Sequence, residues 1–372
     1  MPRISGAISS RPVKATVVAA VSSFALVGGV FAGAGLAQAQ TAPEASAASH
    51  AYRHGAVPKL DPSTGRAVTA PDAGTATNAN NLSYGGAIDG IGVTTGAPRV
   101  YVIYWGSQWG KATTTNGVVH LSGDKSGMAP DQQSFFKGLG SSTDKWSGVM
   151  TQYCQGIATG AQSCPSTAAH VGYPGTGGAL AGVWEDTSAV PSAASGHQIA
   201  EEAIKAAAHF GNTTAAKNRN VQYVITFPSG TDPDNYQTQG FCAWHDYNGD
   251  TTLSGGAATS PYGDIAFTNM PYLPDAGASC GAGFVNKPGL LDGITIVGGH
   301  EYAETITDQN PAGGWTDAQG NEDGDKCAWI SSGTGASQNI TLSTGKFAVQ
   351  STWGNDGNGG AGACEVSHAF VK

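Results

Sequence analysis

Six cysteines restrict the folds open to this chain of 372 residues more than any other feature. An even number of cysteines in an exported chain favours disulfide bonds. A zinc–thiolate site is disfavoured, because the sequence contains no C-x-x-C pair. Six cysteines allow fifteen connectivities in principle. Their spacing favours three local bridges in sequential order: Cys154–Cys164, Cys242–Cys280 and Cys327–Cys364.

The N-terminus predicts that the chain is exported. Three basic residues precede an uncharged stretch rich in Ala, Val and Gly, Ala15–Leu36, and the sequence Ala37-Gln38-Ala39 follows. This pattern is typical of a signal peptide covering residues 1–39, cleaved after Ala39. A membrane anchor is the alternative, but the stretch is only weakly hydrophobic and no second apolar run of spanning length occurs. We therefore expect a secreted, extracellular protein without membrane contact after cleavage.

Removal of the signal peptide leaves 15 basic residues against 27 acidic ones, a net charge of about −12. Binding to nucleic acid depends on Lys and Arg neutralising phosphates, so an acidic chain argues against such a partner.

Composition divides the rest of the chain into two parts. Residues 40–80 are rich in Ala, Pro, Thr and Ser and contain few large apolar side chains, which predicts a disordered linker or a pro-segment. Residues 81–372 have the length of a single large extracellular domain.

Short β-branched and aromatic runs alternate with helical patterns in this domain. Strands are predicted at Arg99–Gly106, Val221–Thr226 and Asp264–Met270. Helices are predicted at Asp131–Leu139, His197–Phe210 and Gly289–Thr307, the last with one apolar face formed by Leu290, Leu291, Ile294 and Val297. The order predicts an α/β (α+β) fold with a mixed sheet, stapled by disulfides.

The last of these helices carries the main candidate for chemistry, the motif H-E-x-x-E. His300 and Glu304 are four residues apart and project from one face, a spacing that suits two ligands of one metal ion. Glu301 is offset so that it could serve as the general base for a bound water, as the Glu of a helical H-E-x-x-H site does. Carboxylate is an acceptable zinc ligand, although it also makes calcium, manganese or iron credible. An ordinary hydrogen-bonded helical pair is the simpler alternative.

A third ligand is required, and the sequence offers several. The favoured residues are Glu322 or Asp325, in an acidic loop next to Cys327. Asp308, at the end of the helix, and His245, next to Cys242, are weaker candidates. Gly298 and Gly299 interrupt the helix at a cost of about 1 kcal/mol each, which suggests close packing or a functional reason.

Three loops have partial calcium-site character: residues 246–250, 321–325 and 355–358. Structural calcium is one interpretation, and Asx turns are the other. Other catalytic classes lack their motifs, because no G-x-S-x-G elbow, free cysteine or phosphate-binding glycine loop is expected.

Several separated blocks between residues 82 and 364 resemble the EXORDIUM, or phosphate-induced, family of extracellular proteins, and also bacterial exported proteins regarded as zincin-like peptidases. One departure is Gly85, where family members carry a His. The resemblance implies a secreted, wall-associated setting, and it groups the helix pair with the acidic loop as one signature. The blocks are Leu82-Ser83-Tyr84-x-Gly86, Tyr104-Trp105-Gly106, Cys242-Ala243-Trp244-His245, His300-Glu301-x-Ala303-Glu304-x-x-Thr307-Asp308, Gly314-Trp315, Glu322-x-Gly324-Asp325-x-Cys327, Val349-Gln350-x-x-Trp353-x-Asn355 and Cys364.

Two functions compete on this basis. The first is a secreted metal-dependent hydrolase, a zinc metallopeptidase acting on a protein or peptide with Glu301 as general base. The second is a non-catalytic extracellular module with a structural metal, which binds a cell-wall polysaccharide or signals. Exposed Trp side chains would favour the second, whereas core packing is their simpler role; the candidates are Trp105, Trp109, Trp315 and Trp353.

Overall fold

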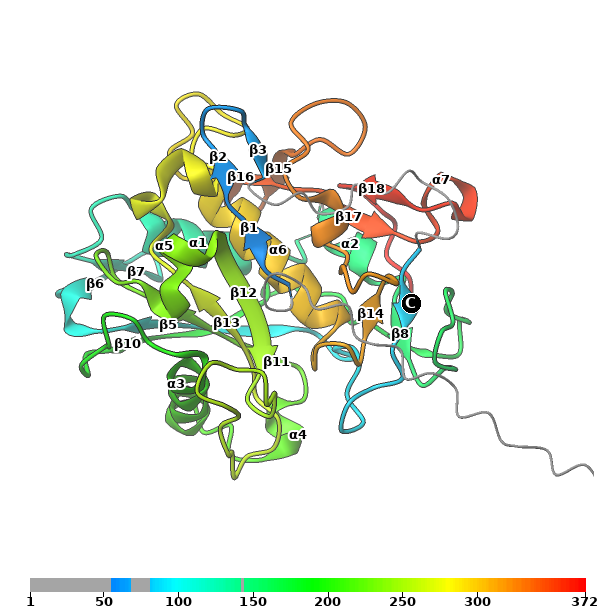
Figure 1. The fold of residues 1–372 in the computed structure, drawn as a ribbon, viewed down its shortest axis with the longest axis horizontal. Coiled ribbons are helices and arrows are strands. Elements are labelled where there is room, and N and C mark those ends of the chain that lie inside the picture. Colours follow the sequence, from blue (N-terminus) through cyan, green and yellow to red (C-terminus); the bar gives the residue numbers. More distant parts are fainter. Residues whose placement is uncertain (1–54, 68–80, 142–143) are drawn as a thin grey trace, which may run out of the picture. The chain divides into compact units, whose positions relative to one another are not determined.

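A six-stranded mixed sheet forms the centre of the fold, in the order β1 (Val57–Pro58), β12 (Phe241–Tyr247), β13 (Ala266–Met270), β11 (Val221–Thr226), β5 (Arg99–Trp105) and β10 (Leu180–Asp186). The computed structural model describes residues 55–67, 81–141 and 144–372, so the predicted signal peptide lies outside it. Strands β13, β11, β5 and β10 run parallel. By contrast, β12 is antiparallel to β13, and β1 is antiparallel to β12 (Figure 1). The mixed α/β fold class is confirmed.

Helices cover both faces of the sheet. Along β5, Tyr101 and Ile103 bury on the face covered by α3 (Gly196–His209), whereas Val102 and Tyr104 bury on the opposite face. This second face packs against α1 (Met128–Gly138) and α6 (Asp292–Thr307). Side chains alternate in direction along a strand, so a strand covered on both faces is apolar in its buried part, as β5 is from Val100 to Trp105. The predicted strands and helices are all present, with ends shifted by up to three residues.

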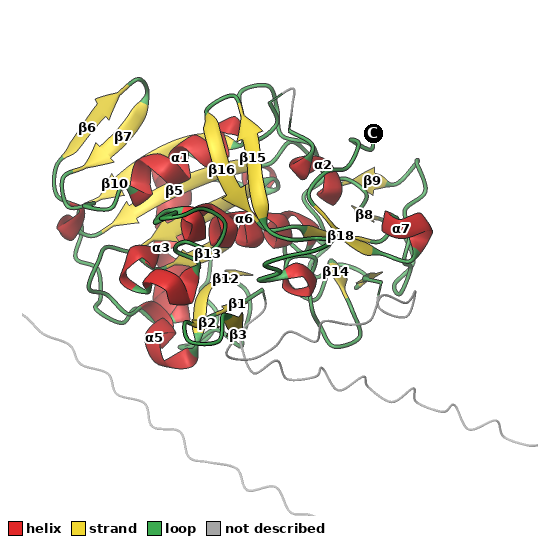
Figure 2. Cartoon of the chain, turned by 90° about the horizontal axis from the view of Figure 1, so that it is seen from above, coloured by secondary structure: helices red, strands yellow, loops and turns green. Residues whose placement is uncertain are grey.

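Helix α6 is buried on every side, and the prediction of a single apolar face is wrong. All sixteen of its residues are buried. The sheet covers one side, and a hairpin of β15 (Gln338–Leu342) and β16 (Gly345–Val349) packs against it as well (Figure 2). The helix begins at Asp292 rather than Gly289, so Leu290 precedes it and is 69% exposed. The polar side chains of α6 therefore lie in the core.

Shorter elements complete the described part of the chain. They are β2 (Leu60–Asp61), β3 (Arg66–Ala67), β4 (Ser83–Tyr84), β6 (Ala112–Thr115), β7 (Val118–Leu121), α2 (Trp146–Met150), β8 (Cys154–Gln155), β9 (Ala169–His170), α4 (Ala215–Asn218), α5 (Tyr236–Gln239), β14 (Trp315–Thr316), β17 (Thr352–Gly354), α7 (Gly357–Gly360) and β18 (Ala363–Glu365). Within the described ranges, no helix combines the length and apolarity needed to cross a membrane.

The three predicted disulfides are confirmed, with the sequential pairing. Cys154 bonds Cys164, Cys242 bonds Cys280 and Cys327 bonds Cys364. The second bridge ties β12 to the turn before α6, and the third ties the acidic loop to β18. Two of the three bridges therefore fix the segments that flank α6.

Residues 55–67 are ordered, so the expectation of disorder is wrong for this part of 40–80. Val57 and Leu60 are buried in the same core as Ile296 and Val297 of α6. Strand β1 also gains backbone hydrogen bonds from β12, and β2 pairs with β3 as a hairpin. Burial of Val57 and Leu60 and the pairing of β1 with β12 therefore give a defined structure to a segment of largely polar composition. Residues 40–54 and 68–80 lie outside the described part.

Glycines near α6 provide a test of this packing. A Cβ on Gly298 would lie 3.6 Å from Met270 Cε, an ordinary contact, whereas a Cβ on Gly314 would lie 2.2 Å from the Thr307 carbonyl oxygen. We expect Gly298→Ala to stabilise the fold by up to about 1 kcal/mol through helix propensity. Gly314→Ala should destabilise it by about 2 kcal/mol or more, because backbone must move. Urea unfolding of both variants checks the contrast, and equal midpoints would contradict it.

Candidate metal centre

His300 and Glu304 lie together in the core at the centre of α6. Both are fully buried, and His300 Nε2 lies 2.9 Å from Glu304 Oε1. Gln350 holds the imidazole from the other side, because its Oε1 lies 3.1 Å from His300 Nδ1. The Gln350 Nε2 donates to the carbonyl oxygen of Gly324, so its Oε1 is the acceptor and His300 Nδ1 carries the proton. This leaves Nε2, which faces Glu304, as the ring nitrogen that could bind a metal.

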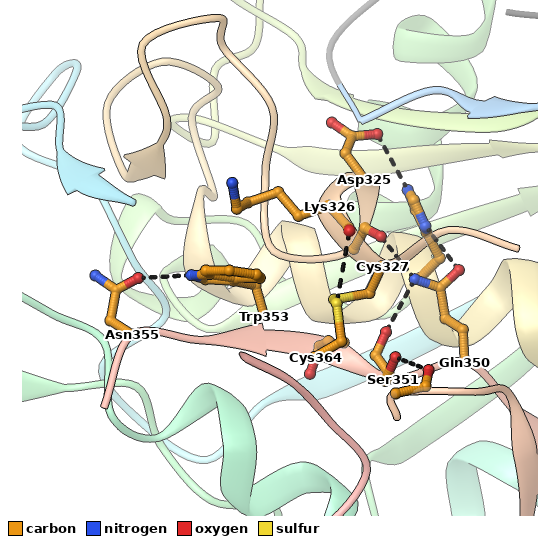
Figure 3. The surroundings of a disulfide bond; sticks show 12 residues. Asp325, Lys326, Cys327, Gln350, Ser351, Trp353, Asn355 and Cys364 are labelled. Atoms are coloured by element: carbon orange, nitrogen blue, oxygen red, sulfur yellow. Dashed lines mark hydrogen bonds and ion pairs between the residues drawn. A yellow bond between two sulfur atoms is a disulfide. The ribbon is translucent and has the colours of Figure 1, made fainter. Parts of the chain in front are cut away.

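The acidic loop supplies Asp325 as the third member of this group. Asp325 Oδ1 lies 3.7 Å from His300 Nε2, and the Asp325 N–H donates to Glu304 Oε1 at 2.9 Å. The N–H of Glu322 donates to the other Asp325 oxygen at 3.0 Å, so the loop orients the carboxylate. The disulfide between Cys327 and Cys364 anchors this loop beside Gln350 (Figure 3). His300, Glu304 and Asp325 together have the donors and the spacing of a metal site.

His245 and Glu322 form a second group with the same glutamate. His245, on β12, lies with its Nε2 3.0 Å from Glu322 Oε2 and 3.7 Å from Glu304 Oε2. All three side chains are buried. Both favoured third ligands are therefore at the site, Asp325 with His300 and Glu322 with His245. His245 is only a weaker candidate from the sequence, because the pairing of β12 with β13 is what places it opposite α6.

Asp308 does not belong to either group. Its carboxylate accepts hydrogen bonds from the N–H groups of Ala312 and Gly314, in the turn after α6. Burial is the main cause that raises the pKa of Glu322, and the neighbouring Asp308 carboxyl group adds to the rise. Asp308 is a supporting residue behind the site, although the helix spacing alone made it a candidate ligand.

Glu301 lies next to His300 in α6 and is enclosed by the described residues. Only 1% of it is exposed, and burial raises its pKa well above the usual value. The charge on Glu304 adds to this rise, whereas the backbone N–H of Val57 in β1 lowers the pKa. Neither carboxylate oxygen meets full hydrogen-bond geometry with any described group. The N-terminal segment therefore covers the residue predicted to be the general base.

Buried acidic groups dominate the electrostatics of this region. Burial is the main cause that raises the pKa of Glu304 and Glu322 well above the usual range, and neighbouring carboxylates add to it. Burial also raises the pKa of Asp308 to about 6 and that of Asp323 to about 7. Buried carboxylates are stable only when protonated, paired or bound to a cation. Among the described residues, moreover, neither Glu304 Oε2 nor His300 Nε2 has a hydrogen-bond partner. These donors fit a divalent ion.

Loop 246–250 resembles an Asx turn, whereas Asp356 of loop 355–358 lies in a cluster with Glu365 and His368. Asp250 accepts hydrogen bonds from the N–H and hydroxyl of Thr252, two residues on. Asn355 accepts from the N–H of Leu82 and the indole of Trp353. Loop 321–325 instead belongs to the metal-type cluster described above.

Comparisons of the chain with protein-family models, curated proteins and solved structures give no match. The case for a function therefore rests on the residues of the site itself.

The raised pKa of Asp323 predicts how pH acts on the metal-free fold. Its pKa is 3.8 when unperturbed and about 7 in the fold, so the folded chain holds a proton that the unfolded chain releases between these values. This contribution to stability is complete below pH 3.8 and is lost as pH rises to 7. In chelator, Asp323→Asn should therefore have a higher Tm than the parent chain at pH 8, by about 5 °C, and a smaller advantage at pH 4. An advantage that does not grow with pH would contradict this.

Proposed function

We propose that this chain is a secreted metal-dependent hydrolase, specifically a zinc metallopeptidase, with Glu301 as its general base. The observation that carries the proposal is the group His300, Glu304 and Asp325, brought together from one helix and one disulfide-anchored loop. One imidazole and two carboxylates are a ligand set that zinc accepts. Glu301 follows His300 directly in the helix, as a general base does in helical H-E-x-x-H sites.

The roles of the residues follow from their positions. An ion held by His300, Glu304 and Asp325 would polarise a substrate carbonyl and lower the pKa of water. Glu301 would take the proton of the attacking water as a C–O bond forms, and return it to the amide nitrogen as the C–N bond breaks. Burial raises the pKa of Glu301, and a nearby cation would lower it again. Gln350 would keep His300 in the tautomer that binds the ion.

The proposal also includes secretion of the chain and its kinship with known protein families. The three disulfides favour an oxidising compartment, and the A-x-A pattern at residues 37–39 favours export. We also propose kinship with EXORDIUM-like and bacterial zincin-like proteins. The helix, acidic loop and Gln350 of the resembling blocks meet around one site, which supports treating them as one signature.

A non-catalytic module with a structural metal is the second candidate, favoured by the complete burial of the site. Binding of a polysaccharide by this module would require exposed Trp side chains. The four Trp side chains that would have formed it are at most 7% exposed and pack in the core: Trp105, Trp109, Trp315 and Trp353.

Hydrolysis of an unfolded protein separates the two candidates. Because residues 55–58 cover Glu301, the assay uses the mature chain before and after limited proteolysis, with zinc added. Glu301→Gln should lower the rate by about 10²- to 10⁴-fold, the usual contribution of a general base, while metal content stays unchanged. Glu201→Gln, an exposed change of the same type on α3, is the matched control. Activity that survives Glu301→Gln or a chelator would refute the peptidase. Bound zinc without hydrolysis in any sample would favour the structural module.

A further inference from the structure

The two metal-type groups meet at a single carboxylate. Glu304 Oε1 lies 2.9 Å from His300 Nε2, and Glu304 Oε2 lies 3.7 Å from His245 Nε2. Each imidazole has its own acidic partner from the loop: Asp325 for His300 and Glu322 for His245. Each oxygen of Glu304 therefore faces a different imidazole–carboxylate pair.

Each group alone has the size of a site for one ion. Ligands at 2.0–2.2 Å from a tetrahedral zinc lie about 3.3 Å from one another. The imidazole-to-carboxylate distances are 2.9 and 3.7 Å around His300, and 3.0 and 3.7 Å around His245. The five residues nevertheless fall into two compact groups rather than one. One ion at either position would leave the other pair of ligands unused.

The negative charge of the buried acidic side chains also favours two ions over one. Glu304, Glu322 and Asp325 are all buried, and Asp323 lies fully buried in the same loop. One divalent ion compensates two of these negative charges, whereas two ions compensate all four. An acidic core of this kind is much better balanced by a pair of cations.

We propose that Glu304 bridges two divalent ions, one held by His300 and Asp325 and the other by His245 and Glu322. A carboxylate can bind one ion through each oxygen, and two-ion hydrolytic sites hold their ions about 3.5–4 Å apart. Mixed imidazole and carboxylate donors suit zinc or manganese. The proposal rests on the proposed metal site but not on peptidase activity.

Zinc stoichiometry tests the bridge. The purified mature chain, stripped with chelator and titrated with zinc by calorimetry, should bind two ions per chain. His245→Ala and His300→Ala should each retain one ion, and the shape-conserving Glu304→Gln should weaken both by tenfold or more. His368→Ala is the control, because His368, Asp356 and Glu365 form a third, more exposed cluster that could bind zinc by itself. Its removal should leave two ions.

A spectroscopic measurement on the unmutated chain guards against variants that fail to fold. Two cobalt ions that share one carboxylate couple magnetically, so their EPR signal should be weaker than that of two isolated ions. Binding of a single ion to the His368→Ala chain, or uncoupled cobalt, would overturn the bridge while leaving the proposed hydrolase in place. Binding of no ion would overturn both.

A separate observation concerns the segment that covers this site. Strand β1 pairs with the outer edge of β12, with Val57 opposite Ala243. The N–H of Lys59 then donates to the Gly240 carbonyl at 2.7 Å, and the indole of Trp329 donates to the Pro58 carbonyl at 2.7 Å. The segment is therefore held by its backbone, in an extended conformation.

The same segment passes directly over the ligands. Gly55 has a positive φ of 59°, and a Cβ there would lie 2.4 Å from both Glu304 Oε2 and His245 Nε2. Two residues on, Val57 of β1 is buried against α6, the helix that carries Glu301. A peptide substrate of the proposed enzyme must bring its backbone to this position, between the base and the ligands.

We infer that residues 55–67 occupy the substrate site as an inhibitory pro-segment, an inference that rests on the proposed peptidase function. Exposed strand edges bind extended peptides through backbone hydrogen bonds, and β1 takes up the edge of β12 that would otherwise do so. Only two residues pair in β1, and Pro58 has no N–H to donate. The segment can therefore leave without disruption of the sheet.

Val57→Asp tests this inference by placing a charge where the segment buries an apolar side chain. Thr64→Asp is the matched control, because Thr64 is exposed in the turn between β2 and β3. Release of bound zinc to a chelator should be at least tenfold faster in Val57→Asp than in Thr64→Asp, and hydrolysis of an unfolded protein should rise likewise. A synthetic peptide of residues 55–67 should reverse both effects.

The two readouts separate the two ideas. Faster zinc release without hydrolysis would support the claim that residues 55–67 cover the metal site. It would refute the peptidase, and with it the inhibitory role of the segment. Equal zinc release and equal hydrolysis in Val57→Asp and Thr64→Asp would overturn the pro-segment and leave the peptidase standing. Circular dichroism of both variants identifies any loss of fold, and in that case removal of the segment by proteolysis, followed by the same two readouts, replaces Val57→Asp.

Discussion

The burial of Glu304 is the constraint on which the rest of the site depends. A carboxylate in the middle of a helix that is covered on every side can keep its charge only beside cations or strong donors. The structure surrounds it with two imidazoles and with the N–H of Asp325, and places further acids beyond them. These neighbours come from a strand, a helix and a loop far apart in the sequence. The fold around α6 is therefore organised by electrostatics as much as by apolar packing.

Part of this arrangement could be predicted from sequence, because it depends on local spacing. The helical period places His300 and Glu304 on one face wherever the helix lies, and short gaps between cysteines favour sequential disulfides. Strand β11 is predicted to the residue because its β-branched and aromatic side chains favour an extended chain. These features require no knowledge of which segments meet.

The parts that sequence analysis missed depend on long-range pairing. His245 reaches the site only because β12 pairs antiparallel with β13, a neighbour that no local pattern identifies. Asp325 and Glu322 looked equivalent, yet Asp325 lies beside His300 and Glu322 lies beside His245. Likewise, Val57 orders its segment by pairing with a strand almost two hundred residues away, so composition gave the wrong expectation. Helix α6 looked one-sided because polar side chains are usually exposed, whereas here they are buried with the rest of the helix.

The disulfide between Cys327 and Cys364 and the contact of Gln350 with His300 have a consequence for the order of synthesis. A growing chain makes its covering segment first, His245 next, then the helix, and the residues that orient His300 and anchor the loop almost last. The site is thus complete only when nearly the whole polypeptide has been made. Until then, the ligands that precede residue 350 lack the contacts that hold them in position. The proposed metal site would therefore form late in biosynthesis, after the segment that covers it has been made.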